Sequence, residues 1–145
     1  MRVRLGYPDP ESELRILADE PSETALKTLK PVIKAEQVVK MQQEVRKVEM
    51  DERIVEYLMN VVHATRNHPD LLVGASPRAA LALQRVAKSS AVLARRDYCL
   101  PDDVKSFAIP VFGHRIISKK FAHEPTRQTC DHVMEQILDS VPVPS

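Results

Sequence analysis

Apolar residues recur at intervals of three and four positions along most of this chain, a pattern typical of helices that bury one face. Six segments are expected to be helical: 10–20, 35–50, 51–67, 76–96, 101–110 and 126–140. The expected inward stripe of residues 35–50 consists of Val38, Met41, Gln42, Val45 and Val48. That of residues 51–67 consists of Ile54, Leu58, Val61, Val62 and Thr65. The pattern therefore predicts an all-α fold with about five to six helices.

Capping and helix-breaking residues place the ends of these helices. Asp51 is expected to be an N-cap, and Ser76 another, with Pro77 at the first helical position. Pro110 is expected to stop the helix that begins at Pro101. Residues 21–34, 68–75 and 97–100 are predicted to be loops, and 112–120 to be irregular with an extended piece at 115–117.

The start of the chain does not follow the helical pattern. Arg2–Leu5 alternates polar and apolar residues and is followed by Gly6 and Pro8, which predicts a short strand and a turn. A lone strand has no partner for its backbone groups. We therefore expect the chain to begin inside a larger fold, as a piece of a longer protein.

Composition limits the classes of protein to be considered. Of the 145 residues, 43% are apolar, 28% are charged and three are glycine, which suits a helical domain with a real core. The formal net charge of +1 gives no general field for binding nucleic acid. No transmembrane run or signal peptide is visible. Cys99 and Cys130 match no metal spacing and are expected to be free thiols in the cytoplasm.

Motifs for catalysis are absent from the sequence. It contains neither GxxxxGK[ST] nor GxGxxG, so a self-contained nucleotide hydrolase of the commonest kind is excluded. The five histidines show no HExxH or paired spacing, and no metal site is expected. The carboxylate pairs at 51–52 and 102–103 are explained by helix capping, so no catalytic residue is assigned.

Gly74-Ala75-Ser76-Pro77-Arg78 is the most informative stretch. Arg78 falls in the first helical turn, where a cation meets the positive end of the helix dipole. An anion such as phosphate would suit the guanidinium and the free N–H groups there. Alternatively, Arg78 pairs with a nearby carboxylate or points into water.

The order and spacing of several motifs resemble the C-terminal part of MoxR-type AAA+ ATPases over nearly the whole chain. These motifs are residues 4–9 (RLGYPD), 68–70 (HPD), 74–78 (GASPR), 96–98 (RDY), 101–105 (PDDVK) and 114–115 (HR), with the Ile-Leu and Val-Pro ending at 135–144. The resemblance implies a small helical lid that follows an αβα core. Residues 1–9 would be the end of that core, 10–140 the lid and 141–145 a tail.

The resemblance also implies a site. Arg78 would be the sensor-2 arginine that contacts the phosphates of the nucleotide, with Gly74, Ser76 and Pro77 building the helix start. Tyr7 and Pro8 would form the core–lid connection near the adenine. The intact protein would use ATP with magnesium as a chaperone-like hexamer that matures partners or loads metals into them.

The implied partners are the protein's own AAA+ core, neighbouring subunits and proteins with von Willebrand factor A domains, with no nucleic acid and no membrane. The motifs of the core are missing here, so the chain alone should bind no nucleotide firmly and hydrolyse none. Two other classes stay open: a free-standing helical interaction module and a histone-like DNA-binding module.

Overall fold

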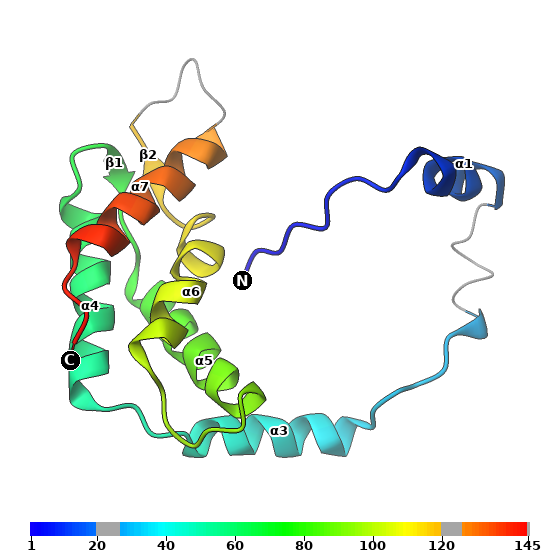
Figure 1. The fold of residues 1–145 in the computed structure, drawn as a ribbon, viewed down its shortest axis with the longest axis horizontal. Coiled ribbons are helices and arrows are strands. Elements are labelled where there is room, and N and C mark those ends of the chain that lie inside the picture. The colour runs from blue at the N-terminus through cyan, green and yellow to red at the C-terminus, as the bar shows by residue number, and fades with distance from the viewer. Residues whose placement is uncertain (20–26, 120–125, 145) are drawn as a thin grey trace. The chain divides into compact units, whose positions relative to one another are not determined.

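Helices make up most of the structure, a computed structural model that describes residues 1–19, 27–119 and 126–144. These residues fall into two units. One unit is Val3–Met41, and the second consists of Met1–Arg2 and Gln42–Ser145. The helices are α1 (Pro10–Asp19), α3 (Ala35–Lys47), α4 (Glu52–Asn67), α5 (Pro77–Leu93), α6 (Pro101–Phe112) and α7 (Thr126–Ser140) (Figure 1). The strands are β1 (Leu71–Val73) and β2 (Ile117–Ser118). The all-α prediction is confirmed.

The predicted caps of α4 and α5 are confirmed. Asp51 Oδ1 accepts a hydrogen bond of 2.9 Å from the backbone N–H of Arg53. Ser76 Oγ accepts one of 3.2 Å from Ala79, and Pro77 is the first residue of α5. Each cap satisfies an N–H that the helix itself leaves without a partner.

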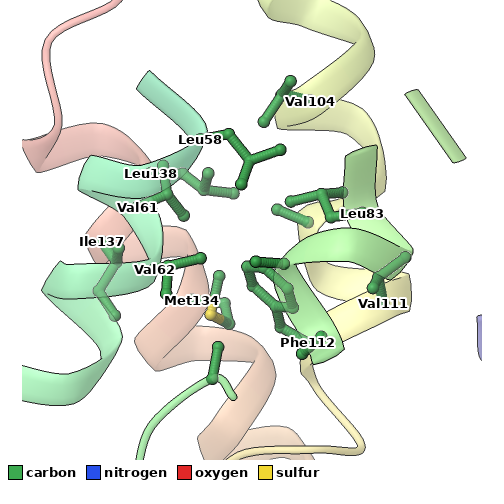
Figure 2. Close-up of a cluster of buried hydrophobic side chains, with 14 of the residues drawn as sticks. Leu58, Val61, Val62, Leu83, Val104, Val111, Phe112, Met134, Ile137 and Leu138 are labelled. Atoms are coloured by element: carbon green, nitrogen blue, oxygen red, sulfur yellow. The ribbon is translucent and has the colours of Figure 1, made fainter. Parts of the chain in front are cut away.

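One hydrophobic core joins α4, α5, α6 and α7. Figure 2 shows side chains from these four helices converging on one volume. The labelled residues include Leu58, Val61 and Val62 of α4, Leu83 of α5, Val104, Val111 and Phe112 of α6, and Met134, Ile137 and Leu138 of α7. Burying a side chain of this size contributes about 1.5–3 kcal/mol. The core therefore fixes the start of α5 against its neighbours.

The stripe predicted for residues 35–50 does not become a buried helix face. α3 ends at Lys47 and has no buried residue, and Val38 and Met41 are exposed. Val48, which follows the helix, is buried. Glu49 leaves the helical pattern because its N–H donates to Asp97 O (2.8 Å) and its carbonyl accepts from Cys99 (3.0 Å).

Two other predicted helix ends are wrong. α6 continues through Pro110 because Val111 and Phe112 are fully buried, and their packing outweighs the hydrogen bond that proline cannot donate. α5 ends at Leu93 rather than Arg96 because Arg95 has a left-handed φ of 58°. The N–H of Arg96 then donates to Ala91 O at 2.8 Å, as in a Schellman motif without glycine.

The loop predicted at 68–75 contains strand β1, which the sequence analysis missed. β1 pairs antiparallel with β2, with Leu71 opposite Ser118 and Val73 opposite Ile117. The extended piece expected at 115–117 overlaps β2 only at Ile117. Leu71 is buried whereas Leu72 and Val73 are exposed, so three residues with one buried side chain were too short a pattern to identify.

The strand predicted at Arg2–Leu5 does not form, because no strand among the described residues pairs with it. Arg2 is instead attached to the helical unit. Its backbone N–H donates to Pro110 O at 2.7 Å, and its guanidinium donates to both carboxylate oxygens of Asp131. A Cβ at Gly113 would lie 2.5 Å from Asp131 Oδ1, so glycine leaves room for this ion pair.

Candidate functional site: the turn at 74–78 and an arginine-lined hollow

The turn that precedes α5 is held by two side chains of α4. Thr65 Oγ1 accepts a hydrogen bond of 2.9 Å from the N–H of Ala75 and donates one of 2.6 Å to Val62 O. Arg66 Nε donates to the carbonyl of Ala75 at 2.9 Å. Both backbone groups of Ala75 are therefore bonded, and its side chain is buried. This arrangement fixes the direction in which α5 begins.

Gly74 allows this turn to approach α4 closely. A Cβ at Gly74 would lie 2.6 Å and 2.7 Å from Cα and N of Arg66 and 2.8 Å from the carbonyl carbon of Thr65. These are backbone atoms of α4, one face of which is buried in the core, so they cannot move aside as a flexible side chain would. The requirement for glycine here comes from space, since the φ of Gly74 is not in the left-handed region.

Arg78 is exposed in the first turn of α5, which fits both a phosphate-binding group and the alternative of a side chain that points into water. Within the described ranges no carboxylate forms an ion pair with its guanidinium, and its backbone N–H has no hydrogen-bond partner. The alternative of pairing with a nearby carboxylate is therefore not observed there. Gly74, Ser76 and Pro77 precede Arg78 at the start of α5. That they support a nucleotide site stays a prediction.

Arg78 lines an open surface hollow of about 690 Å³ together with two further arginines, Arg85 and Arg115. Ser76, Leu81 and Ala82 complete the lining, and no carboxylate belongs to it among the residues that the structure describes. Arg85 lies seven residues after Arg78 on α5, so the two share a helix face. Arg115 comes from the turn after α6, where its N–H donates to Phe112 O at 2.7 Å.

The sequence analysis did not assign Arg85 or Arg115 to the site. The spacing of seven residues between Arg78 and Arg85 was a usable signal, because residues two helical turns apart lie on one face. The sequence contains no such signal for Arg115, because its turn reaches the hollow only through the packing of α6 against α5. Tyr7 and Pro8 lie in the Val3–Met41 unit and are exposed there, and their place near the adenine stays a prediction.

A second charged cluster, around Arg96 and Asp103, stabilises the fold. Arg96 Nη1 and Nη2 donate to Asp103 Oδ2 and Oδ1 at 2.9 and 2.8 Å. Asp103 also accepts from Ser90 Oγ and from the N–H of Leu100, each at 2.8 Å. Burial would raise the pKa of Asp103, but the hydrogen bonds from Arg96, Leu100 and Ser90 outweigh it and the pKa is lowered. This cluster explains the spacing of the Arg-Asp-Tyr and Pro-Asp-Asp motifs.

The remaining reactive side chains form no site in the part of the chain that the structure describes. No group of three or more histidine, cysteine or acidic residues there could hold a metal ion. Cys99 and Cys130 are buried and free, and burial raises the pKa of the Cys99 thiol. Among the described helices, none is long and apolar enough to cross a membrane.

Known proteins resemble both the sequence and the fold. The AAA lid domain family matches residues 63–137, just over half of the chain. Uncharacterized protein YeaC of Bacillus subtilis is 35% identical over 99% of this chain and 44% of its own length. Chaperone MoxR1 of Mycobacterium tuberculosis is 29% identical over 80% of this chain and 33% of its own length.

A solved structure agrees with these sequence relatives. The crystal structure of a provisionally assigned ATPase from Cytophaga hutchinsonii superposes with a TM-score of 0.77 and 32% sequence identity. The match covers 100% of this chain and 46% of that one. The chain thus spans less than half the length of each of these three proteins.

Proposed function

We propose that this chain senses bound nucleotide through Arg78. The premise is its family: the chain belongs to the AAA lid domain family and is the lid region of a MoxR-like AAA+ ATPase. In this proposal Arg78 acts as the sensor-2 residue and donates hydrogen bonds to the phosphates of ATP. The lid then transmits the phosphate state by rigid-body motion against an AAA+ core.

The observation that carries the proposal is the state of Arg78. Its guanidinium is exposed beside its own unpaired backbone N–H in the first turn of α5, in a hollow whose described lining holds three arginines and no carboxylate. A guanidinium and a helix N-terminus both favour phosphate oxygens. Thr65, Arg66 and Gly74 hold the turn before it, so the direction of Arg78 is set by the buried part of the fold.

The other parts of the proposal follow from the family. Residues 1–9 would be the last segment of the core, and residues 10–140 would be the lid. The core would supply the Walker motifs and the ligands of magnesium, since the described residues contain no cluster that could hold a metal ion. The protein would work in the cytoplasm as a hexameric, chaperone-like ATPase with von Willebrand factor A domain partners. The family match favours this role over a free-standing interaction module or a histone-like module.

Arg78→Ala tests the proposal in the ATPase that carries this lid. We expect the rate of ATP hydrolysis to fall about tenfold or more, because a charge-assisted hydrogen bond of about 1.5–3 kcal/mol is lost. Arg78→Lys should recover part of the rate, since lysine keeps the charge but not the fork of donors. Steady-state ATPase assays measure both.

Arg46→Ala is the matched control, since Arg46 is also exposed and no ion pair among the described residues uses it. Arg78→Ala should change the free energy of unfolding of the chain by no more than about 0.5 kcal/mol. A large loss of stability together with normal hydrolysis would assign Arg78 a structural role and remove it from the site.

A further inference from the structure

We propose that Arg85 and Arg115 join Arg78 in one binding site for the polyphosphate chain of a nucleotide. The lid would then contact the nucleotide with three guanidinium groups from two elements, where the sensor-2 role needs one. This inference rests on the proposed function and adds two phosphate-binding residues to it.

The three arginines of the hollow differ from the arginines that hold the fold together. Arg2, Arg53 and Arg96 each form an ion pair with an aspartate. Arg78, Arg85 and Arg115 have no ion pair in residues 1–19, 27–119 and 126–144, yet they line the same hollow. Like charges that share a hollow repel one another, and a bound anion removes that cost. The arrangement is therefore suited to an occupant with several negative charges.

The charges of the hollow are widely spaced. Arg78 and Arg85 lie two turns apart on α5, roughly 10 Å along the helix axis. This separation suits a chain of phosphoryl groups better than a single phosphate ion. Arg115 enters from a different element, the turn after α6, so the cations surround the hollow and do not merely follow one helix.

The side chain of Arg115 is held by its neighbour in the sequence. Its Nε donates to His114 Nε2 at 3.2 Å, which requires that nitrogen of His114 to carry no proton. Burial and the neighbouring positive charge of Arg115 lower the pKa of His114, which favours the neutral imidazole that this hydrogen bond requires. The η nitrogens of Arg115 stay available, and these are the donors that bind phosphate in pairs.

The shape of the site favours a small polyanion over an acidic protein segment. The hollow has a volume of about 690 Å³, within the range of about 300–1,000 Å³ that small-ligand sites occupy. Leu81 and Ala82 give it an apolar part, and Ser76 adds a hydroxyl. A concave surface with a cationic lining matches a nucleotide, whose charge is concentrated in its phosphates.

The experiment is a calorimetric titration of the chain with inorganic tripolyphosphate, with orthophosphate and a glutamate-rich peptide as comparison probes. We expect tripolyphosphate to bind more tightly than either probe and to weaken with added salt. Arg85→Ala and Arg115→Ala should each weaken tripolyphosphate binding at least about fivefold at low salt. Arg46→Ala removes the same charge from an exposed site outside the hollow and should weaken it less than twofold.

The outcomes separate this inference from the proposed function. If Arg78→Ala weakens binding while Arg85→Ala and Arg115→Ala behave like Arg46→Ala, the three-arginine site is wrong and the role of Arg78 stands. If all three hollow variants weaken binding but Arg78→Ala leaves ATP hydrolysis unchanged, the anion site stands and the sensor role fails. Tighter binding of the peptide would overturn the choice of a polyphosphate. Circular dichroism melts confirm that each variant is folded.

Discussion

Asp103→Ala is expected to lower the free energy of unfolding by about 3–5 kcal/mol, the usual loss when one partner of a buried ion pair is removed. The Asp103 carboxylate is 5% exposed and accepts hydrogen bonds from Arg96, Ser90 and the backbone of Leu100. Without it, the guanidinium of Arg96 stays partly buried and uncompensated. The connector from α5 to α6 loses its main polar contact at the same time.

Asp102→Ala is the matched control, because Asp102 is the exposed neighbour of Asp103 in the first turn of α6. It should cost no more than about 1 kcal/mol, the usual contribution of an acidic residue near a helix N-terminus. Urea denaturation of both variants measures the difference. Equal losses for the two variants would contradict the structural role of the Arg96–Asp103 pair.

The same ion pair predicts how stability depends on pH. Because the pKa of Asp103 is lowered in the folded state, the folded chain binds fewer protons than the unfolded chain. The stabilisation is therefore complete above the unfolded pKa of about 3.9 and is lost as the pH falls through the lower, folded pKa. The destabilisation caused by Asp103→Ala should be present at neutral pH and shrink in acid.

Gly74→Ala is expected to destabilise the chain by roughly 2–3 kcal/mol, in the upper part of the range for an overpacked site. The added methyl group would lie 2.6–2.8 Å from backbone atoms of Arg66 and Thr65. The turn would have to move away from α4, which would lengthen the hydrogen bond from the N–H of Ala75 to Thr65 Oγ1. Thermal or urea denaturation measures the loss of stability.

Ser76→Ala provides the comparison for Gly74→Ala. It removes the cap of α5 without adding an atom and should cost about 1 kcal/mol. Hydrogen exchange then distinguishes the mechanisms, because Gly74→Ala should expose the amide of Ala75 whereas Ser76→Ala should not. A Gly74→Ala variant with native stability and a protected Ala75 amide would show that the close approach is unimportant.

Local signals in the sequence predicted the helical part of the fold well. Asp51, Ser76 and Pro77 mark helix starts through backbone chemistry that does not depend on distant residues. The errors arise where contacts between residues far apart in the sequence determine where a helix ends. Burial of Val111 and Phe112 carries α6 past Pro110, and hydrogen bonds to the connector at 97–99 remove Glu49 from α3.

The residues of the candidate site also differ in whether a local sequence signal marks them. Arg78 was predictable from its place after a strong helix start, and Gly74 belonged to the motif that marked it. Thr65 and Arg66 have no local signal, because their contacts with Ala75 span ten and nine residues and depend on the folded turn. Arg115 meets the hollow only through the packing of α6 against α5.

The most direct test of the central claim is a crystal structure of the ATPase that carries this lid, bound to a non-hydrolysable ATP analogue. The account predicts that an Arg78 guanidinium nitrogen lies about 2.7–2.9 Å from a phosphate oxygen of the nucleotide, the distance of a charge-assisted hydrogen bond. An occupied nucleotide site with Arg78 directed into solvent, or paired with a carboxylate of the protein, would contradict it.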